Sequence, residues 1–110
     1  MNIYDTANQL AQEIKKSEEY ISYKKSKEEI EKNPELKKKV EEFEKTRYEV
    51  QVLAIQGKEV EEEKNRKLQE MYTTLIQNKE IKEFFDVEIK FNVMLADVNK
   101  IIAESVQDVV

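Results

Sequence analysis

The amino-acid sequence predicts an all-α protein, and three observations carry this prediction. The chain has one proline, Pro34, and one glycine, Gly57, so few residues interrupt a helix. Apolar residues recur at helical spacing, and no strand-like alternation stands out. Charged residues make up 39% of the chain, which suits helices with one buried stripe and a broad solvated face. We therefore expect one domain, residues 1–110, folded as an elongated antiparallel bundle of about five helices.

Two helices are expected before Pro34. Asp5 is a good N-cap for a first helix over 5–16, because its carboxylate can accept the free amide protons of the first turn. Ser17 is the next cap candidate, and it predicts a second helix over 17–32. The apolar stripe of the second helix is thin, and the sequence leaves open whether the two helices run on with only a kink.

Asn33 and Pro34 mark the sharpest boundary in the chain. An asparagine caps a helix, and a proline in the first helical position lacks only an amide that would be unpaired there. A third helix is therefore expected over 34–56, with Gly57 ending it as a left-handed C-cap.

Two further helices are expected, over 60–77 and 79–107. Acidic residues 61–63 suit the first turn of one, and Asn78 can cap the other. In the last helix, residues recur every seven positions in three adjacent columns: Phe84, Phe91 and Val98; Glu88, Leu95, Ile102 and Val109; Val87, Met94 and Ile101. Such a wide apolar face suits the centre of a bundle or an oligomer, so the long helices over 34–56 and 79–107 are placed at the centre.

Self-association is expected because one neighbour cannot cover all the apolar flanks. The C-terminal half of the 34–56 helix is apolar over more than one face, which implies a second partner. Apolar residues are only 39% of the chain, so association between chains is expected to supply part of the stability. The residues predicted to form a homodimer or larger interface are Tyr48, Val52, Ile55, Val87, Met94 and Ile101.

Two charged residues lie within apolar rows. Arg47 interrupts the row of the 34–56 helix, and Glu88 begins a column that continues through Leu95. An unpaired buried charge is costly, so we expect each to find a partner and predict an Arg47–Glu88 ion pair between the two helices. The alternative interpretation makes Glu88 a buried functional carboxylate.

No catalytic, metal-binding or cofactor-binding residue is predicted. The chain has no His and no Cys, which removes the commonest general base, the thiolate nucleophile and the best transition-metal ligands. The remaining acids are interleaved with lysines, as on solvated helix faces. Enzymatic activity and a cofactor are therefore not expected.

The charge balance argues against direct binding of nucleic acid or membrane. A net charge of −5 repels phosphates and anionic lipid. Tyr23 with Lys24, Lys25 and Lys27 comes nearest to a stacking platform with a basic groove, but acidic residues follow at once. No apolar run approaches the length of a membrane span, so a cytoplasmic protein is expected.

The order of several short segments resembles the YlbF/YmcA family of small bacterial helical proteins, especially its short YheA-like branch. The segments are Ile3-Tyr4-Asp5, Ser17-Glu18-Glu19-Tyr20, Asn33-Pro34-Glu35-Leu36, Phe43, Gln56-Gly57-Lys58-Glu59-Val60, and finally Glu88, Leu95, Asn99, Ile101 and Ile102. The resemblance implies an all-helical protein that forms dimers or larger assemblies without known enzymatic activity. It further implies a regulatory adaptor, as in the branches that act in competence, sporulation and biofilm formation, partly in a complex that assists ribonuclease Y.

The resemblance does not imply an iron–sulfur cluster in this chain. In the better-studied branches such clusters are associated with cysteines of a C-terminal extension, and this sequence has no Cys. The function predicted is a non-enzymatic, homo-oligomeric interaction module of the regulatory-adaptor type. The alternatives are an accessory RNA-processing factor of a ribonuclease complex or a direct RNA-binding module, and least favoured is a carboxylate-based enzyme.

Overall fold

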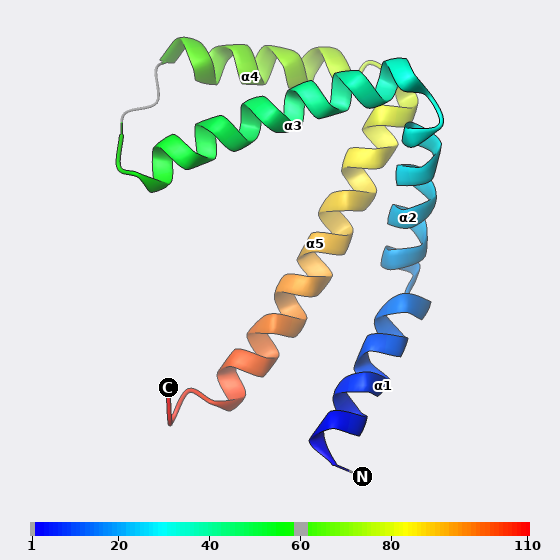
Figure 1. Cartoon of the computed structure of the whole chain (residues 1–110), viewed down its shortest axis with the longest axis vertical. Helices are drawn as coiled ribbons and strands as arrows, with labels where there is room; N and C mark the ends of the chain where they lie inside the picture. Colours follow the sequence, from blue (N-terminus) through cyan, green and yellow to red (C-terminus); the bar gives the residue numbers. More distant parts are fainter. Residues whose placement is uncertain (1, 59–61) are drawn as a thin grey trace. The chain divides into compact units, whose positions relative to one another are not determined.

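The fold is all-α, as predicted, and the computed structural model describes residues 2–58 and 62–110. No strand occurs in these ranges. The helices are α1 (Ile3–Lys16), α2 (Glu18–Glu31), α3 (Pro34–Ile55), α4 (Glu62–Leu75) and α5 (Lys79–Ser105) (Figure 1). The two longest are α3 with 22 residues and α5 with 27, which confirms the long helices expected from the sequence.

The first helix begins earlier than expected, and the prediction of Asp5 as its N-cap is wrong. The side-chain oxygen of Asn2 accepts a hydrogen bond from the amide of Asp5 at 2.9 Å, so Asn2 is the cap and α1 starts at Ile3. Asp5 instead lies in the first turn, where its negative charge suits the helix dipole.

Ser17 separates α1 from α2, which settles the question that the sequence left open. Its backbone is extended, with φ −68° and ψ 149°, so the two helices do not run on as one. The Ser17 hydroxyl oxygen accepts a hydrogen bond from the amide of Tyr20 at 3.2 Å, as expected of an N-cap.

The ends of α3 lie where Asn33, Pro34 and Gly57 predict them. The side-chain oxygen of Asn33 accepts hydrogen bonds from the amides of Glu35 at 3.2 Å and Leu36 at 3.3 Å. At the other end Gly57 has φ 72°, the left-handed conformation that glycine adopts without strain. The amides of Gly57 and of the residue after it donate to carbonyls of the last helical turn, the pattern of a Schellman motif.

Of the boundaries of the last two helices, the start of α5 agrees with the sequence, and both C-terminal ends come two residues earlier than expected. The expected start of α4 at residue 60 lies outside the described residues, and the helix ends at Leu75 rather than at residue 77. Asn78 caps α5 as predicted, accepting a hydrogen bond from the amide of Ile81 at 3.1 Å. Helix α5 ends at Ser105, two residues before the expected end, and the Ser105 hydroxyl donates to the carbonyl of Ile102 at 2.6 Å. That side-chain bond satisfies a carbonyl of the last turn without another helical residue.

The described chain forms two compact units. The terminal unit contains the residues up to Lys27 and from Phe84 onward, so it holds α1, most of α2 and most of α5. The central unit, within Glu28–Glu83, holds the end of α2, all of α3 and α4, and the start of α5. The single domain expected from the chain length stays a prediction.

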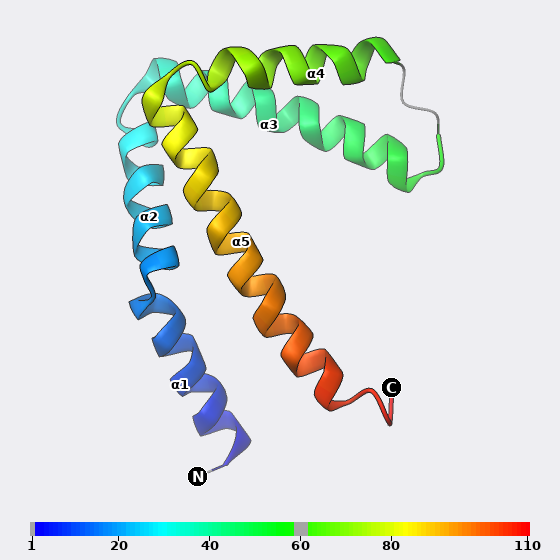
Figure 2. The same ribbon diagram turned by 180° about the vertical axis from the view of Figure 1, so that it is seen from behind.

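Aromatic contacts hold α2 against α5 in the terminal unit. The Tyr23 ring lies 5.8 Å from that of Phe84 and 5.1 Å from that of Phe91, measured between centroids. Tyr20 adds a second contact with Phe91 at 6.2 Å. Tilted aromatic pairs at these separations stabilise a core beyond the apolar area that they bury. Figures 1 and 2 show α2 beside the first half of α5, with the start of α1 and the end of α5 away from this contact.

The central unit is built on the hairpin of α3 and α4, which lie closest where α3 begins and α4 ends (Figure 2). The rings of Phe43 on α3 and Tyr72 on α4 lie 6.0 Å apart, and the guanidinium of Arg47 lies 5.6 Å from the Phe43 centroid. The buried apolar residues of this unit are Ile30, Leu36, Val40, Phe43, Leu75 and Ile81.

The Asn33 cap provides a direct test of how α3 begins. We expect Asn33→Ala to lower the free energy of unfolding by about 1 kcal/mol, because two amides of the first turn lose their acceptor. The measurement is urea unfolding followed by circular dichroism at one fixed protein concentration.

Asn65→Ala provides the matched control, because Asn65 is exposed within α4 and caps no helix. A loss of stability in the control as large as that of Asn33→Ala would contradict the capping role.

Candidate interaction surfaces

The C-terminal half of α3 exposes the apolar residues that the sequence singles out. The side chains of Tyr48 and Ile55 are 66% and 86% exposed, and Val52 between them is half-buried. We call these three residues the α3 flank. Apolar side chains of this size, exposed side by side on one helix, are typical of an interaction surface.

The predicted interface residues on α5 do not share one degree of exposure. Val87 is buried, Met94 is half-buried and Ile101 is 68% exposed. Exposure therefore rises along this seven-residue column toward the end of the helix. Sequence reasoning missed a second exposed pair, Ile89 and Val93, which lies outside the three columns singled out in α5.

Helix α1 carries an apolar face that its own unit covers only in part. None of its residues is buried, and Leu10 and Ile14 are half-buried. Ile3 and Tyr4 at the start of the helix are largely exposed. An amphipathic helix is stabilised mainly by burial of its apolar face, so α1 has apolar surface left for a partner.

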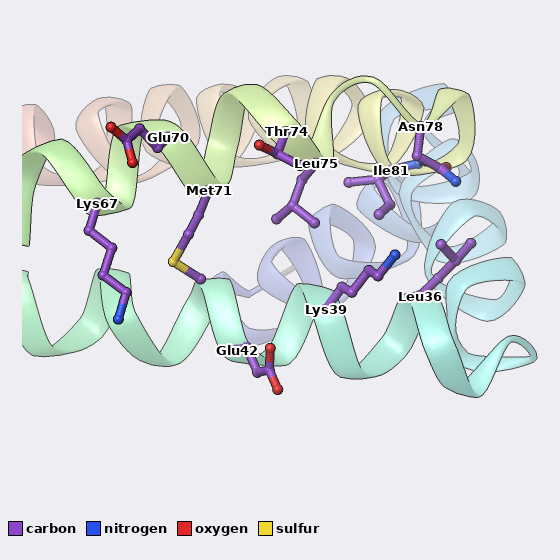
Figure 3. A pocket seen from close by; sticks show the side chains of 10 residues that line it. All are labelled: Leu36, Lys39, Glu42, Lys67, Glu70, Met71, Thr74, Leu75, Asn78 and Ile81. Atoms are coloured by element: carbon purple, nitrogen blue, oxygen red, sulfur yellow. Dashed lines mark hydrogen bonds between the residues drawn. The ribbon is translucent and has the colours of Figure 1, made fainter.

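A groove of about 380 Å³ runs between α3 and α4, and we call it the hairpin groove (Figure 3). Leu36, Leu75 and Ile81 are buried at its floor, and Met71 is half-buried beside them. The remaining lining residues are Lys39, Glu42, Lys67, Glu70, Thr74 and Asn78. The volume lies within the range of protein ligand sites. Sequence reasoning missed this groove, because it exists only once three helices are brought together.

The structure gives Glu88 and Arg47 a neighbour each, in different units. The Tyr23 hydroxyl donates a hydrogen bond to a Glu88 carboxylate oxygen at 3.3 Å, so this carboxylate has a partner across the α2–α5 contact. The Arg47 guanidinium lies over the Phe43 ring, a cation–π arrangement. The Arg47–Glu88 ion pair stays a prediction.

The acidic residues of the described chain do not assemble into a metal site. No group of three or more carboxylates is placed to hold a metal ion in residues 2–58 and 62–110. Exposed ion pairs one helical turn apart occur instead, such as Lys39 with Glu35 at 3.4 Å, and pairs of this kind add little to stability. In the same ranges no helix combines the length and apolar character that crossing a bilayer requires.

Two substitutions of Tyr23 separate the contribution of its hydrogen bond from that of its ring to the α2–α5 contact. Tyr23→Phe keeps the ring between Phe84 and Phe91 and removes the donor to Glu88, so we expect a loss of about 1 kcal/mol. Tyr23→Ala also removes the ring, and we expect a loss of about 3 kcal/mol. Urea unfolding at one protein concentration measures both.

The control is Tyr4→Ala, at a tyrosine that is largely exposed. Equal losses for Tyr23→Phe and Tyr23→Ala would show that the aromatic cluster is not what holds α2 to α5.

Comparison with known proteins matches a family model along nearly the whole chain. The model is described as "Control of competence regulator ComK, YlbF/YmcA", and it matches residues 3–107.

Bacterial relatives match over similar lengths. A UPF0342 protein of Caldicellulosiruptor saccharolyticus is 39% identical over 105 residues, which cover 96% of this chain and 88% of the relative. UPF0342 protein STH1710 of Symbiobacterium thermophilum is 36% identical over 104 residues, which cover 94% of this chain and 93% of the relative. These matches confirm the resemblance seen in the short segments of the sequence, and the chain belongs to the YlbF/YmcA family.

Proposed function

We propose that this protein is a non-enzymatic regulatory adaptor that works as a homodimer or larger assembly in the cytoplasm. The observation that carries the proposal is the exposure of large apolar side chains on α1, α3 and α5. An adaptor acts by holding protein partners together, and apolar helix faces with charged rims are suited to that task.

The energetics favour association over isolated chains. Burying one Ile or Tyr side chain that is now exposed contributes roughly 1.5–3 kcal/mol. The α3 flank together with Ile101 offers several such side chains. Even after the loss of translational and rotational freedom, a handful of them can sustain a dimer at micromolar concentration. We propose the α3 flank and the exposed part of α5, Met94 and Ile101, as surfaces of self-association.

The family supports a regulatory role. Its description refers to control of the competence regulator ComK, which places its members in a network of regulatory proteins. We propose that this chain also has a regulatory role, and that its partners are proteins which it recognises through its helix faces. The hairpin groove and the apolar faces of α1 and α5 give such partners separate places to bind.

A charge placed on the α3 flank tests self-association. We expect Val52→Asp to weaken assembly at least about tenfold, because association would bury the new carboxylate without a partner. Lys38→Asp, on the same helix at an exposed position, serves as the control and is expected to leave assembly nearly unchanged. The measurement is molar mass by light scattering over a dilution series.

A second variant is needed because Val52 is half-buried, so that Val52→Asp could weaken assembly by unfolding the chain. Tyr48→Glu changes a side chain that is already 66% exposed, so we expect it to fold normally and to weaken assembly as well. Unchanged mass in both flank variants would remove the α3 flank from the interface.

A further inference from the structure

The break between α1 and α2 at Ser17 changes the direction in which the apolar face of α1 points (Figure 1). Ile14 on α1 and Tyr23 on α2 are nine residues apart, which is about two and a half turns of an unbroken helix. Without the break, the two side chains would therefore lie on opposite sides of one helix. Tyr23 packs on α5, and Ile14 is half-buried in the same unit. The break thus lets both faces contribute to the terminal unit.

Little holds α1 in this bent arrangement. Leu10 and Ile14 are half-buried, and every other residue of α1 is exposed. The backbone at Ser17 is also close to helical, because its φ of −68° is already the helical value and only its ψ of 149° differs from the roughly −42° of a helix. A rotation about one backbone bond therefore joins α1 to α2.

In the joined helix the apolar residues of α1 form a stripe that continues onto α2. Its members alternate at spacings of four and three residues, which is the heptad pattern of helices that pack against each other. We call this set the heptad stripe: Ile3, Ala7, Leu10, Ile14, Ser17 and Ile21. Ile21 is 54% exposed in the bent structure. Joining the helices would expose the whole stripe, so the joined helix needs a partner.

The heptad stripe of a second copy matches this one in side-chain size. In an antiparallel pair centred between Leu10 and Ile14, large residues face large ones and small residues face small ones. The facing pairs are Ile3 with Ile21, Leu10 with Ile14, and Ala7 with Ser17. Layers matched in this way fill an interface without cavities.

Charge favours the antiparallel direction as well. Glu13 and Glu18 flank the heptad stripe on its two sides. A parallel pair would place Glu13 of each copy beside Glu18 of the other, which makes two contacts between like charges. An antiparallel pair leaves one such contact, between the two Glu13 residues, and Lys16 lies one turn from each of them.

We propose that α1 and α2 join at Ser17 into one helix when two copies meet, and that the heptad stripes of the two copies then pack antiparallel. The proposal rests on the self-association proposed above and names one of its contacts, separate from the α3 flank. In an isolated chain the bend covers Leu10 and Ile14 in part. Pairing with a second copy replaces that partial cover with a complete one, so association drives the straightening.

Introduced cysteines test the contact cleanly, because the chain has no cysteine of its own. Ala11 and Gln12 are both exposed, but in the antiparallel pair Ala11 flanks the centre of the interface and Gln12 points outward. A short bifunctional thiol reagent is added to each variant at the same concentration. We expect Ala11→Cys chains to crosslink at least about tenfold faster than Gln12→Cys chains, because pairing raises the effective concentration of the two thiols.

Substitutions at Ser17 test the joining of the two helices. Ser17→Ala removes the cap and favours helix, so we expect faster crosslinking through Ala11→Cys, although loss of a cap alone would only destabilise. Ser17→Asp keeps the cap and would place a charge between the paired stripes, so we expect crosslinking to slow about tenfold.

Spin labels measure the straightening itself. Asn8→Cys on α1 and Asn99→Cys on α5 are exposed sites in the terminal unit, and the labelled chain is diluted with unlabelled chain. We expect the two labels to lie farther apart in the Ser17→Ala background than in the Ser17→Asp background. Equal separations would overturn the joining of α1 to α2.

Ile21 tests the part of the heptad stripe that lies on α2. Because Ile21 is already exposed, we expect Ile21→Glu to fold normally and to slow crosslinking through Ala11→Cys about tenfold. Lys27→Glu, at an exposed position on another side of the same helix, is the control and is expected to crosslink as before.

The failures of the two proposals are distinguishable. An oligomeric chain in which Ala11→Cys crosslinks no faster than Gln12→Cys overturns this contact and leaves self-association standing. Straightening in Ser17→Ala without crosslinking overturns the second copy as occupant and assigns the heptad stripe to a helix of another protein. A chain that is monomeric at every concentration and does not crosslink contradicts both proposals.

Discussion

The constraint on which the rest depends is an excess of apolar helix surface over what the described chain covers. Helix α5 carries a wide apolar face, yet only its early part meets aromatic residues of α2. Helix α1 buries no residue, and the end of α3 exposes Tyr48 and Ile55. Exposed apolar area of this kind is retained in soluble proteins where a partner covers it. We therefore expect partners to cover the apolar faces of α1, α3 and α5.

Local chemistry made much of the fold predictable. Ser17, Asn33, Asn78 and Gly57 act on amides within a few residues of themselves, so their effects can be read from the sequence. The failure at Asp5 has the same physical origin. Asn2 and Asp5 are both good caps three residues apart, and when Asn2 binds the amide of Asp5 the first turn begins earlier.

The surfaces were less predictable because they depend on which helices meet. Seven-residue spacing put Val87, Met94 and Ile101 in one column, but packing in the structure buries the first and exposes the last. The partner of Glu88 comes from a tertiary contact that no spacing rule specifies, the one with Tyr23, whereas Arg47 lies over the ring of Phe43, one turn earlier on the same helix. The hairpin groove needs side chains from α3, α4 and α5 together, so only the assembled helices define it.

The central claim is that a second copy covers apolar flanks that one chain leaves exposed. Sedimentation equilibrium of the unaltered chain at tens of micromolar tests it most directly. The account predicts a mass that is a multiple of the 13.1 kDa of one chain and that falls on dilution. A mass of one chain at every concentration, with the helical content intact, would contradict it.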